Sequence, residues 1–499
     1  MKHIALRMLL LALALLLCFG TVACADQTDE PDDTKTPTGD EQTPEDEEPE
    51  EEQILPDVEL MDYDYTLSVM HWTNEGAHEN YNPWNEICPA DGVTGQIGDI
   101  IEDAVFDRTG WIKENYGITI TNMYQEHVAL PSQVANLISS GSDEYQVLVE
   151  FGFDAQRVMG KNYFLDMSVV PNIDFEKPWW VKESIEQLSI GEFVELAASD
   201  LLILDKGATS MVFYNIPMAD DLGLGNLYEL VDNGEWTIEA LAECAELAYM
   251  DDGNDQRDEF DTFGIINGDD PVLDLYIGAG MHFIARNADD EYYYSYGFDE
   301  GTLDVMTTIL EEVMYQDFFW NGWLTRNEVT ENQPSFKDGQ SLFNVSMAKA
   351  CNSLRDMEDS YGILPIPKYD EYQESYYSRV NNYHDSLLGV FNTAGNPEAV
   401  GAALEVLSYY SYYNIYPQFY EVVIQGRGTR DDDSRRMLDL IFSTRTYDLG
   451  VIYDPNGFSD QVLRYTAKGD TNLASFIATW ESKLTKAMED LNELASTYW

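Results

Sequence analysis

The order of apolar and polar positions predicts alternating strands and helices in the first part of the folded chain. Strands are expected where apolar residues alternate or run together, and helices where they recur every three or four positions before a glycine. In order, these are a strand at 65–70, a helix at 98–116, a strand at 118–121, a helix at 131–140 and a strand at 145–151. The last is a nearly continuous apolar run, which is typical of a strand buried on both faces. This order predicts a parallel sheet with helices on both sides.

A second group of elements begins near Leu202, and its pattern favours a second α/β lobe. Thr237 is the expected N-cap of a helix, because a hydroxyl there can accept from the first free backbone N–H groups. The other expected elements are strands at 209–214, 341–345 and 361–367, a helix between residues 303 and 319, and a mostly helical chain from 396 to 499.

The first 24 residues have the pattern of a secretory signal. A short basic segment ending at Arg7 precedes the uncharged run Met8–Phe19, which is too short to span a membrane comfortably. Residues 20–24 read Gly-Thr-Val-Ala-Cys. A small residue before a cysteine resembles the bacterial lipobox, which implies cleavage before Cys24 and a lipid on its thiol. The alternative is an ordinary signal peptide that is cut nearby.

Residues 25–58 are expected to form a disordered acidic tether. Between residues 25 and 53 the chain has 14 acidic residues and a single basic one, Lys35. Such a segment buries too little apolar area to offset the entropy of ordering it, and like charges extend it. A calcium-buffering or partner-binding tail is the alternative interpretation.

The charge of the chain restricts its partners. The 499 residues include 27 basic and 92 acidic ones, so the formal net charge is −65 at pH 7. This surplus argues against binding to nucleic acid phosphates and against attachment to anionic lipid through basic patches. Beyond Cys18 and Cys24, the cysteines are Cys88, Cys244 and Cys351. Their odd number and wide spacing predict neither a disulfide framework nor a zinc cluster.

Several local motifs carry a family resemblance. They are Val212-Phe213-Tyr214-Asn215, Gly234-Glu235-Trp236-Thr237, Asp261-Thr262-Phe263-Gly264-Ile265, Phe336-Lys337-Asp338-Gly339 through Phe343, and Tyr361-Gly362-Ile363-Leu364-Pro365-Ile366-Pro367-Lys368-Tyr369-Asp370. In order and spacing they resemble the extracellular solute-binding proteins of bacterial ABC importers, in the carbohydrate-binding group (family 1) related to maltose-binding protein. Ile216-Pro217 stands where that family usually has Lys-Asp. The resemblance covers about residues 59–470.

The resemblance implies an α/β fold of two lobes, the type II periplasmic-binding-protein-like fold, with a hinge that the chain crosses several times. By analogy, lobe 1 comprises 59–203 and 337–392, and lobe 2 comprises 204–336 and 393–499. A solute would bind in the cleft and close the hinge.

Ligands of open α/β sheets bind beyond the carboxyl ends of the strands, and this rule nominates binding residues. Aromatic rings there can stack on a sugar, while carboxylates and amides take its hydroxyls. The candidates at strand ends are Trp72, Asn74, Glu75, Phe153, Asp154, Asp269 and Asp270. The resemblance implies Lys349 as a further contact, and Tyr383 and Asp385, just before the apolar run 387–390, are expected to line the hinge. Asp154 could instead cap a helix, and Asp269 and Asp270 could simply make a turn. Trp179, Trp180, Trp320 and Trp323 are rival stacking residues, although such rings are more often in the core.

Residues 251–259 resemble the calcium loop of EF-hand type found in related proteins. The candidate ligands are Asp251, Asp252, Asn254 and Asp258, because calcium needs closely spaced oxygen ligands. Met250 occupies what would be the first ligand position, and Asp255 replaces the loop glycine. The alternative is a solvated acidic turn. No other cofactor is expected.

The sequence favours binding over catalysis, because it contains no HExxH, GxSxG or P-loop motif. The expected protein is a monomer, lipid-anchored on the outer face of a bacterial cytoplasmic membrane. It captures a carbohydrate, an oligosaccharide by preference, and delivers it to the permease subunits of an ABC transporter. The alternatives are a secreted glycan-active enzyme with a carboxylate pair, and a solute-binding sensor for peptides or other small solutes.

Overall fold

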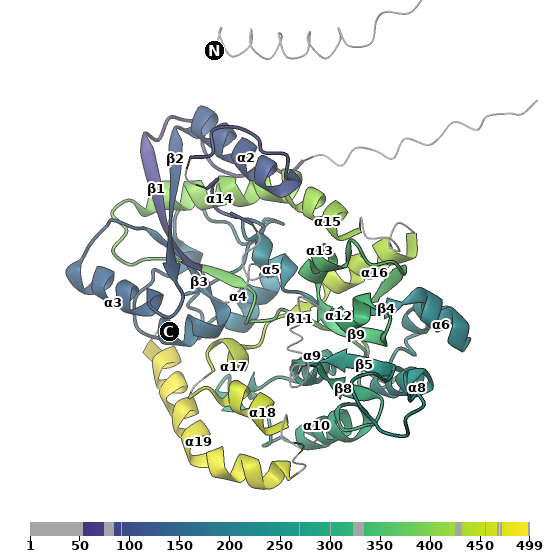
Figure 1. Ribbon diagram of the computed structural model, residues 1–499. Helices are drawn as coiled ribbons and strands as arrows, with labels where there is room; N and C mark the ends of the chain where they lie inside the picture. Colours follow the sequence, from purple (N-terminus) through teal and green to yellow (C-terminus); the bar gives the residue numbers. More distant parts are fainter. Residues whose placement is uncertain are drawn as a thin grey trace, which may run out of the picture. The chain divides into compact units, whose positions relative to one another are not determined.

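The computed structural model describes residues 53–73, 84–90, 92–268, 270–299, 301–322, 334–424, 432–454, 456–466, 469 and 472–497. Residues 54–499 form one compact unit, drawn in Figure 1. The predicted signal peptide, Cys24 and almost all of the acidic tether lie outside the described residues. So do Asn74, Glu75 and Asp269 of the predicted binding residues.

The first sheet has the strand order β12-β3-β1-β2. Its strands are β1 (Tyr65–Thr73), β2 (Ile118–Glu126), β3 (Val147–Phe151) and β12 (Ser386–Val390). β1 is parallel to both β2 and β3, and β12 is antiparallel to β3. The helices between the first three strands are α2 (Ile100–Tyr116) and α3 (Leu130–Ser140). They end at Gly117 and Gly141, whose φ values of 64° and 63° are left-handed. The predicted parallel order is confirmed.

The second sheet has the order β10-β4-β9-β5-β8. Its strands are β4 (Ser210–Asn215), β5 (Phe263–Asn267), β8 (Phe319–Asn321), β9 (Ser341–Met347) and β10 (Tyr361–Leu364). β4 is antiparallel to β9 and β10, whereas β5 is parallel to β8 and β9. The Thr237 hydroxyl accepts from the Ala240 N–H at 3.2 Å, which confirms the predicted cap of α8 (Ile238–Ala248). The two sheets define lobe 1 and lobe 2.

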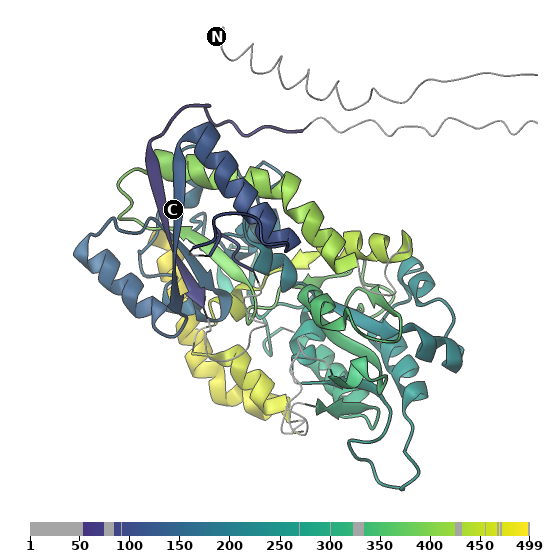
Figure 2. The same ribbon diagram turned by 45° about the horizontal axis from the view of Figure 1, so that its top comes forward.

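The predicted lobe borders are wrong in two places. Residues 337–392 were assigned to lobe 1, but β9 and β10 belong to the second sheet, and only β12 returns to the first. Residues 393 onward were assigned to lobe 2, but α14 (Pro397–Asn414) packs on α2 and β1, as Figure 2 shows. Its Ser411 hydroxyl accepts from Arg108 of α2 at 2.7 Å. The periodicity of a segment indicates its type but not its sheet, because pairing depends on residues far away in the sequence.

Some element ends also differ from the prediction. The expected helix between 303 and 319 is α10 (Thr302–Ile309) followed by a wider turn, η3 (Leu310–Met314), before β8. At the other end, the fold begins before the expected residue 59. The Ile54 N–H donates to the Tyr413 hydroxyl at 2.9 Å, and the Lys177 ammonium lies 3.2 Å from the Asp57 carboxylate.

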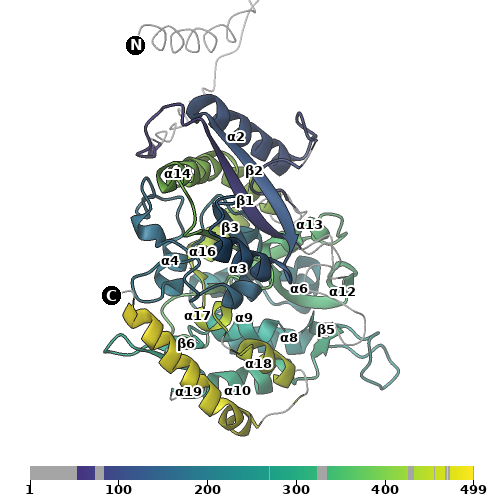
Figure 3. The same ribbon diagram turned by 90° about the vertical axis from the view of Figure 1, so that its left-hand side faces the viewer.

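Further helices cover the two sheets. They are η2 (Met167–Val169), α4 (Lys182–Leu188), α6 (Ile216–Leu222), α7 (Leu227–Asp232), α12 (Pro334–Lys337), η4 (Ala348–Ala350), α13 (Cys351–Leu354), α15 (Tyr416–Ile424), α16 (Asp432–Ser443), α17 (Leu449–Ile452), α18 (Phe458–Thr466) and α19 (Leu473–Thr497). The mostly helical C-terminal part is thereby confirmed. α19 lies beside α10 and the small hairpin β6 (Ile284–Arg286) and β7 (Tyr292–Tyr294), at the bottom of Figure 3. None of the helices in the described part of the chain is long and apolar enough to cross a bilayer.

The chain passes between the lobes more than once, and a small two-stranded sheet lies among the crossing segments. α5 (Ile203–Gly207) leads from lobe 1 into β4. Between β10 and β12, the chain forms β11 (Ser378–Arg379), which pairs in parallel with β13 (Arg445–Thr446). Multiple crossings of this kind form the hinge expected of a two-lobe fold.

Candidate functional site

The carboxyl end of the first sheet holds an aromatic pair inside the lobe. Trp72 is fully buried, and its ring stacks on Phe151 with the centroids 4.4 Å apart. Its indole N–H donates to the Ser386 hydroxyl at 2.9 Å. The ring is therefore covered in this structure, where it packs β1 against β3 and β12. A stacking role for Trp72 stays a prediction, and the burial argues against it.

The predicted acceptor Asp154 is also fully buried, and two basic side chains surround its carboxylate. Asp154 lies in η1 (Gly152–Arg157), the short helix that follows β3. Its Oδ2 is 2.6 Å from Nδ1 of His127, and its Oδ1 is 3.1 Å from Nε of Arg157. His127 comes directly after β2, at the same edge of the sheet. This histidine is not among the predicted binding residues, although its position after a strand satisfies the rule that nominated Asp154.

A second aromatic pair links lobe 1 to a crossing segment. The rings of Phe153 and Tyr383 stack with their centroids 4.9 Å apart and their planes at 26°. Both rings are only partly buried, and the Phe153 N–H donates to the Asn382 carbonyl at 2.8 Å. Tyr383 lies between β11 and β12, so the pair joins the helix after β3 in lobe 1 to a segment that crosses between the lobes.

Acidic groups from lobe 2 and from α18 influence the phenol of Tyr383. Burial raises the pKa of its phenol, and the carboxylates of Asp270 and Asp460 raise it further. Asp270 stands at the start of α9 (Pro271–Gly278), just beyond β5, and is partly exposed. The structure therefore brings three of the predicted binding residues, Phe153, Asp270 and Tyr383, to one region.

Asp385 and Lys349 lie inside the crossing rather than at its surface. Asp385 is fully buried, and its Oδ1 accepts from the Gly152 N–H at 3.0 Å. Burial, and then the nearby Asp205, raise its pKa well above the usual range. Lys349 is 5 % exposed, with its ammonium 2.7 Å from Nδ1 of His384. In this structure both residues hold the crossing segments together.

Two buried ion pairs connect the crossing segments. The Arg379 guanidinium donates to Asp274 of α9 at 3.1 Å and to the Asn382 side-chain carbonyl at 2.7 Å. The Arg445 guanidinium donates to Asp205 of α5 at 2.7 Å. A buried ion pair has well-defined geometry, because moving either partner leaves an uncompensated charge. These pairs fix the relative arrangement of β11, β13 and α9.

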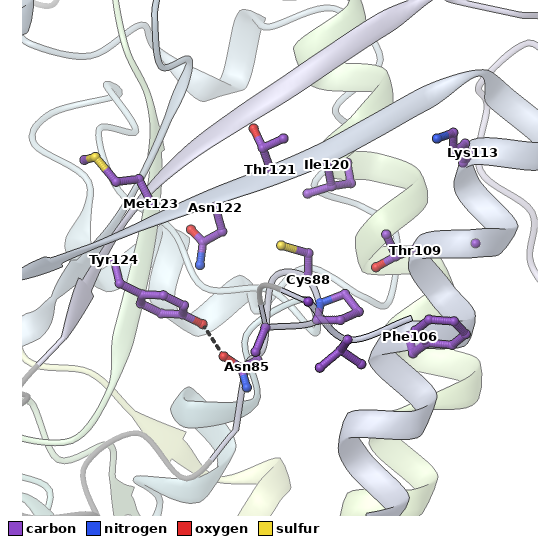
Figure 4. A pocket seen from close by; sticks show the side chains of 15 residues that line it. Asn85, Cys88, Phe106, Thr109, Lys113, Ile120, Thr121, Asn122, Met123 and Tyr124 are labelled. Carbon is purple, nitrogen blue, oxygen red and sulfur yellow. Dashed lines mark hydrogen bonds between the residues drawn. The ribbon is translucent and has the colours of Figure 1, made fainter. Parts of the chain in front are cut away.

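A cavity of about 850 Å³ lies elsewhere in lobe 1, between α2, β2 and residues 85–90 and 92–93. Figure 4 shows the Tyr124 hydroxyl, which donates to the Asn85 side-chain carbonyl at 3.1 Å, at its edge. None of the predicted binding residues described by the structure lines this cavity. It is on the outer edge of the first sheet and is separate from the Tyr383 region.

The acidic loop before β5 brings three carboxylates together. Asp251, Asp252 and Asp261 each offer an oxygen within 4.8 Å of the others. Asp261 is fully buried and is not among the predicted ligands. The predicted ligands Asn254 and Asp258 instead contact each other, with the amide donating to the carboxylate at 3.0 Å. Calcium prefers carboxylate oxygens, and the calcium site stays a prediction for which these three aspartates are the candidate ligands.

Comparison with solved structures identifies the fold. A comparison with family models found no match, and neither did a comparison with curated proteins. An ABC substrate-binding protein from Listeria monocytogenes, solved in complex with cycloalternan, aligns over 85 % of this chain and 99 % of its own, with a TM-score of 0.56 and 10 % identity. A sugar transporter from Rhizobium etli in an open conformation aligns over 86 % and 99 %, with a TM-score of 0.55 and 13 % identity.

The fold is that of the two-lobe solute-binding proteins. The galacto-N-biose and lacto-N-biose I-binding protein from Bifidobacterium longum, in complex with lacto-N-biose, gives a TM-score of 0.51 at 11 % identity, over 86 % of this chain and 97 % of its own. Two-lobe solute-binding folds close around a ligand by a hinge motion. The Phe153–Tyr383 pair and Asp270 lie where such a hinge and the carboxyl ends of both sheets meet.

Proposed function

We propose that this protein is the solute-binding component of a bacterial ABC importer and that its cargo is a carbohydrate, an oligosaccharide by preference. The observation that carries the proposal is the alignment of nearly the whole folded unit with the substrate-binding protein that was solved with cycloalternan. The other two proteins compared above are a sugar transporter and a disaccharide-binding protein. The proposed cycle is capture in the open state, closure of the lobes and release to the permease subunits.

The residues around Tyr383 support a carbohydrate rather than a purely apolar solute. Partly exposed aromatic rings at Phe153 and Tyr383 offer apolar faces, and the Asp270 carboxylate can accept hydrogen bonds from hydroxyl groups. An apolar surface with a few convergent polar groups is the usual composition of a small-molecule site. The proposed role is binding without catalysis.

The same proposal places the protein outside the cytoplasmic membrane, anchored by a lipid on Cys24. Its support is the basic, apolar and small-residue order of residues 1–24, followed by the acidic segment to residue 52. Metabolic labelling with a fatty acid tests it in the producing bacterium. Wild-type protein is expected to carry the label in the membrane fraction, and the Cys24→Ala variant is expected to lose it.

A thermal-shift screen of the purified protein against mono- and oligosaccharides tests the carbohydrate assignment. A solute that binds only the folded state stabilises it by about 2.7 kcal/mol at a hundredfold excess over its dissociation constant. The expected result is an increase in melting temperature with one glycan class, with the glycan recovered unchanged. Reducing ends released by catalytic amounts of protein would contradict the assignment of binding without catalysis.

A further inference from the structure

His127 is held by a buried carboxylate at the edge of the sheet where the solute is proposed to bind. Its Nδ1 lies 2.6 Å from Asp154, and the edge of its ring contacts Phe151, with centroids 5.2 Å apart. Asp154 is fully buried, whereas the His127 side chain keeps 19 % of its surface exposed. Of the two groups, only the imidazole can reach a solute.

Both oxygens of the Asp154 carboxylate face a nitrogen of a basic side chain. Oδ2 lies 2.6 Å from Nδ1 of His127, and Oδ1 lies 3.1 Å from Nε of Arg157. An ionised carboxylate cannot donate, so the proton in the 2.6 Å contact belongs to His127 Nδ1. In a neutral imidazole with a proton on Nδ1, the other nitrogen, Nε2, has a free lone pair.

That second nitrogen is left for a ligand. Within the described residues, the structure gives His127 Nε2 no hydrogen-bond partner. The His127 backbone N–H donates to the Thr73 carbonyl at the end of β1 at 2.9 Å, so the residue is fixed at the carboxyl edge of the sheet. Phe153, which stacks on Tyr383, lies in η1, the short helix that also contains Asp154.

We propose that His127 Nε2 accepts a hydrogen bond from a hydroxyl group of the bound saccharide, and that Asp154 is the positioning residue that fixes the imidazole tautomer. This inference rests on the proposed function. It replaces the expectation that Asp154 itself binds the hydroxyl. The solute presents a free hydroxyl group at this edge of lobe 1. An analogue in which this hydroxyl is O-methylated or replaced by hydrogen should therefore bind more weakly.

The test uses calorimetric titration of the full purified protein with the saccharide that gives the largest thermal shift, and with its deoxy and O-methyl analogues. His127→Phe removes the acceptor and is expected to weaken binding by about five- to tenfold, which corresponds to the loss of one neutral hydrogen bond. The His127→Phe variant is also expected to lose the discrimination against the analogue that is modified at the contacted hydroxyl. His127→Gln restores a polar group near the Nε2 position and should recover most of the affinity.

Two measurements separate positioning from simple structural support. Nitrogen-15 spectra of the imidazoles are expected to show the Nδ1–H tautomer for His127 in wild type and a shift towards the Nε2–H tautomer in Asp154→Asn. The matched control is His282→Phe, because His282 also pairs with a buried carboxylate, Asp448, at 3.1 Å, but lies after α9 in lobe 2. The control should keep the discrimination between analogues.

The outcomes distinguish this inference from the proposed function. Binding by His127→Phe within twofold of wild type, with the same discrimination between analogues, would overturn the role of His127 and leave the carbohydrate assignment standing. An unchanged tautomer in Asp154→Asn would overturn the positioning role. If no saccharide binds the wild-type protein, the proposed function fails, and the contact with a saccharide hydroxyl fails with it.

Discussion

Replacing Arg379 with methionine should destabilise the folded unit strongly, because it leaves a charge buried in the hinge. Arg379 and its partner Asp274 are 1 % and 2 % exposed, and they join a crossing segment to α9. The Asp274 carboxylate has two side-chain partners, the Arg379 guanidinium and the Ser210 hydroxyl. In the variant it keeps only the Ser210 hydroxyl, at 2.7 Å. Removing one partner of a buried pair costs about 3–5 kcal/mol. We therefore expect a loss of this size in the free energy of unfolding at pH 8.

The same variant should become less destabilised at low pH. Burial raises the pKa of Asp274, and the Arg379 guanidinium lowers it, so the substitution raises this pKa further. A carboxyl group with a raised folded-state pKa adds stability below its unfolded pKa and loses it as the pH rises through the folded value. The difference between wild type and Arg379→Met should therefore grow as the pH rises from the folded-state pKa of Asp274 in wild type, which is already above the ordinary value, to the still higher folded-state pKa in the variant.

Urea unfolding followed by circular dichroism at pH 5 and pH 8 measures both effects. The double variant Arg379→Met with Asp274→Asn is the control, because it removes the buried charge together with its partner. It should recover much of the lost stability. A cost below about 1 kcal/mol, in the range of exposed ion pairs, would refute the inference that this pair is a buried charge pair. So would a loss that is the same at both pH values.

Four other substitutions test packing, titration and metal binding. Gly401→Ala should lower the free energy of unfolding by about 1–3 kcal/mol, because the added Cβ would lie 1.9 Å from the Pro171 carbonyl oxygen. Gly110→Ala is the control, because Gly110 is a helical site with open space around it, and it should raise the free energy of unfolding by about 0.5–1 kcal/mol. Thermal melts of both variants measure these changes. Burial raises the pKa of Asp454 to about 7, so wild-type stability should fall between pH 4 and pH 7, and Asp454→Asn should flatten that slope in pH-dependent urea titrations. If calcium binds the acidic loop, EDTA should lower the melting temperature of wild type and leave the melting temperature of Asp261→Asn unchanged. The same melting temperature of wild type with and without EDTA would count against a metal in this loop.

Local sequence signals predicted the first sheet well because its determinants are local. Gly117 and Gly141 end their helices in left-handed conformations, and the apolar run of β3 is buried at every position. The lobe borders could not be read in this way. β9 and β10 have the same apolar pattern whichever sheet they join, and their partner β4 lies more than a hundred residues earlier.

The candidate site was predicted only in part, because burial and partner choice are three-dimensional. The strand-end rule selected Phe153 and Asp270, and the position before an apolar run selected Tyr383; the structure brings these three residues to one region. It could not show that Trp72 stacks on Phe151 inside the lobe or that Asp154 is enclosed by His127 and Arg157. The metal-like loop shows the same effect, because Asp261 follows the motif in sequence but joins the carboxylate cluster in space.

Calorimetric titration of the wild-type protein and of Tyr383→Ala with an oligosaccharide panel tests the central claim most directly. The proposed site predicts that wild type binds one glycan class with a stoichiometry of one. It also predicts that Tyr383→Ala, which loses the stack on Phe153, binds that glycan about tenfold or more weakly, the effect of truncating a central aromatic contact. No heat of binding from any oligosaccharide, or undiminished binding by a folded Tyr383→Ala variant, would contradict the account.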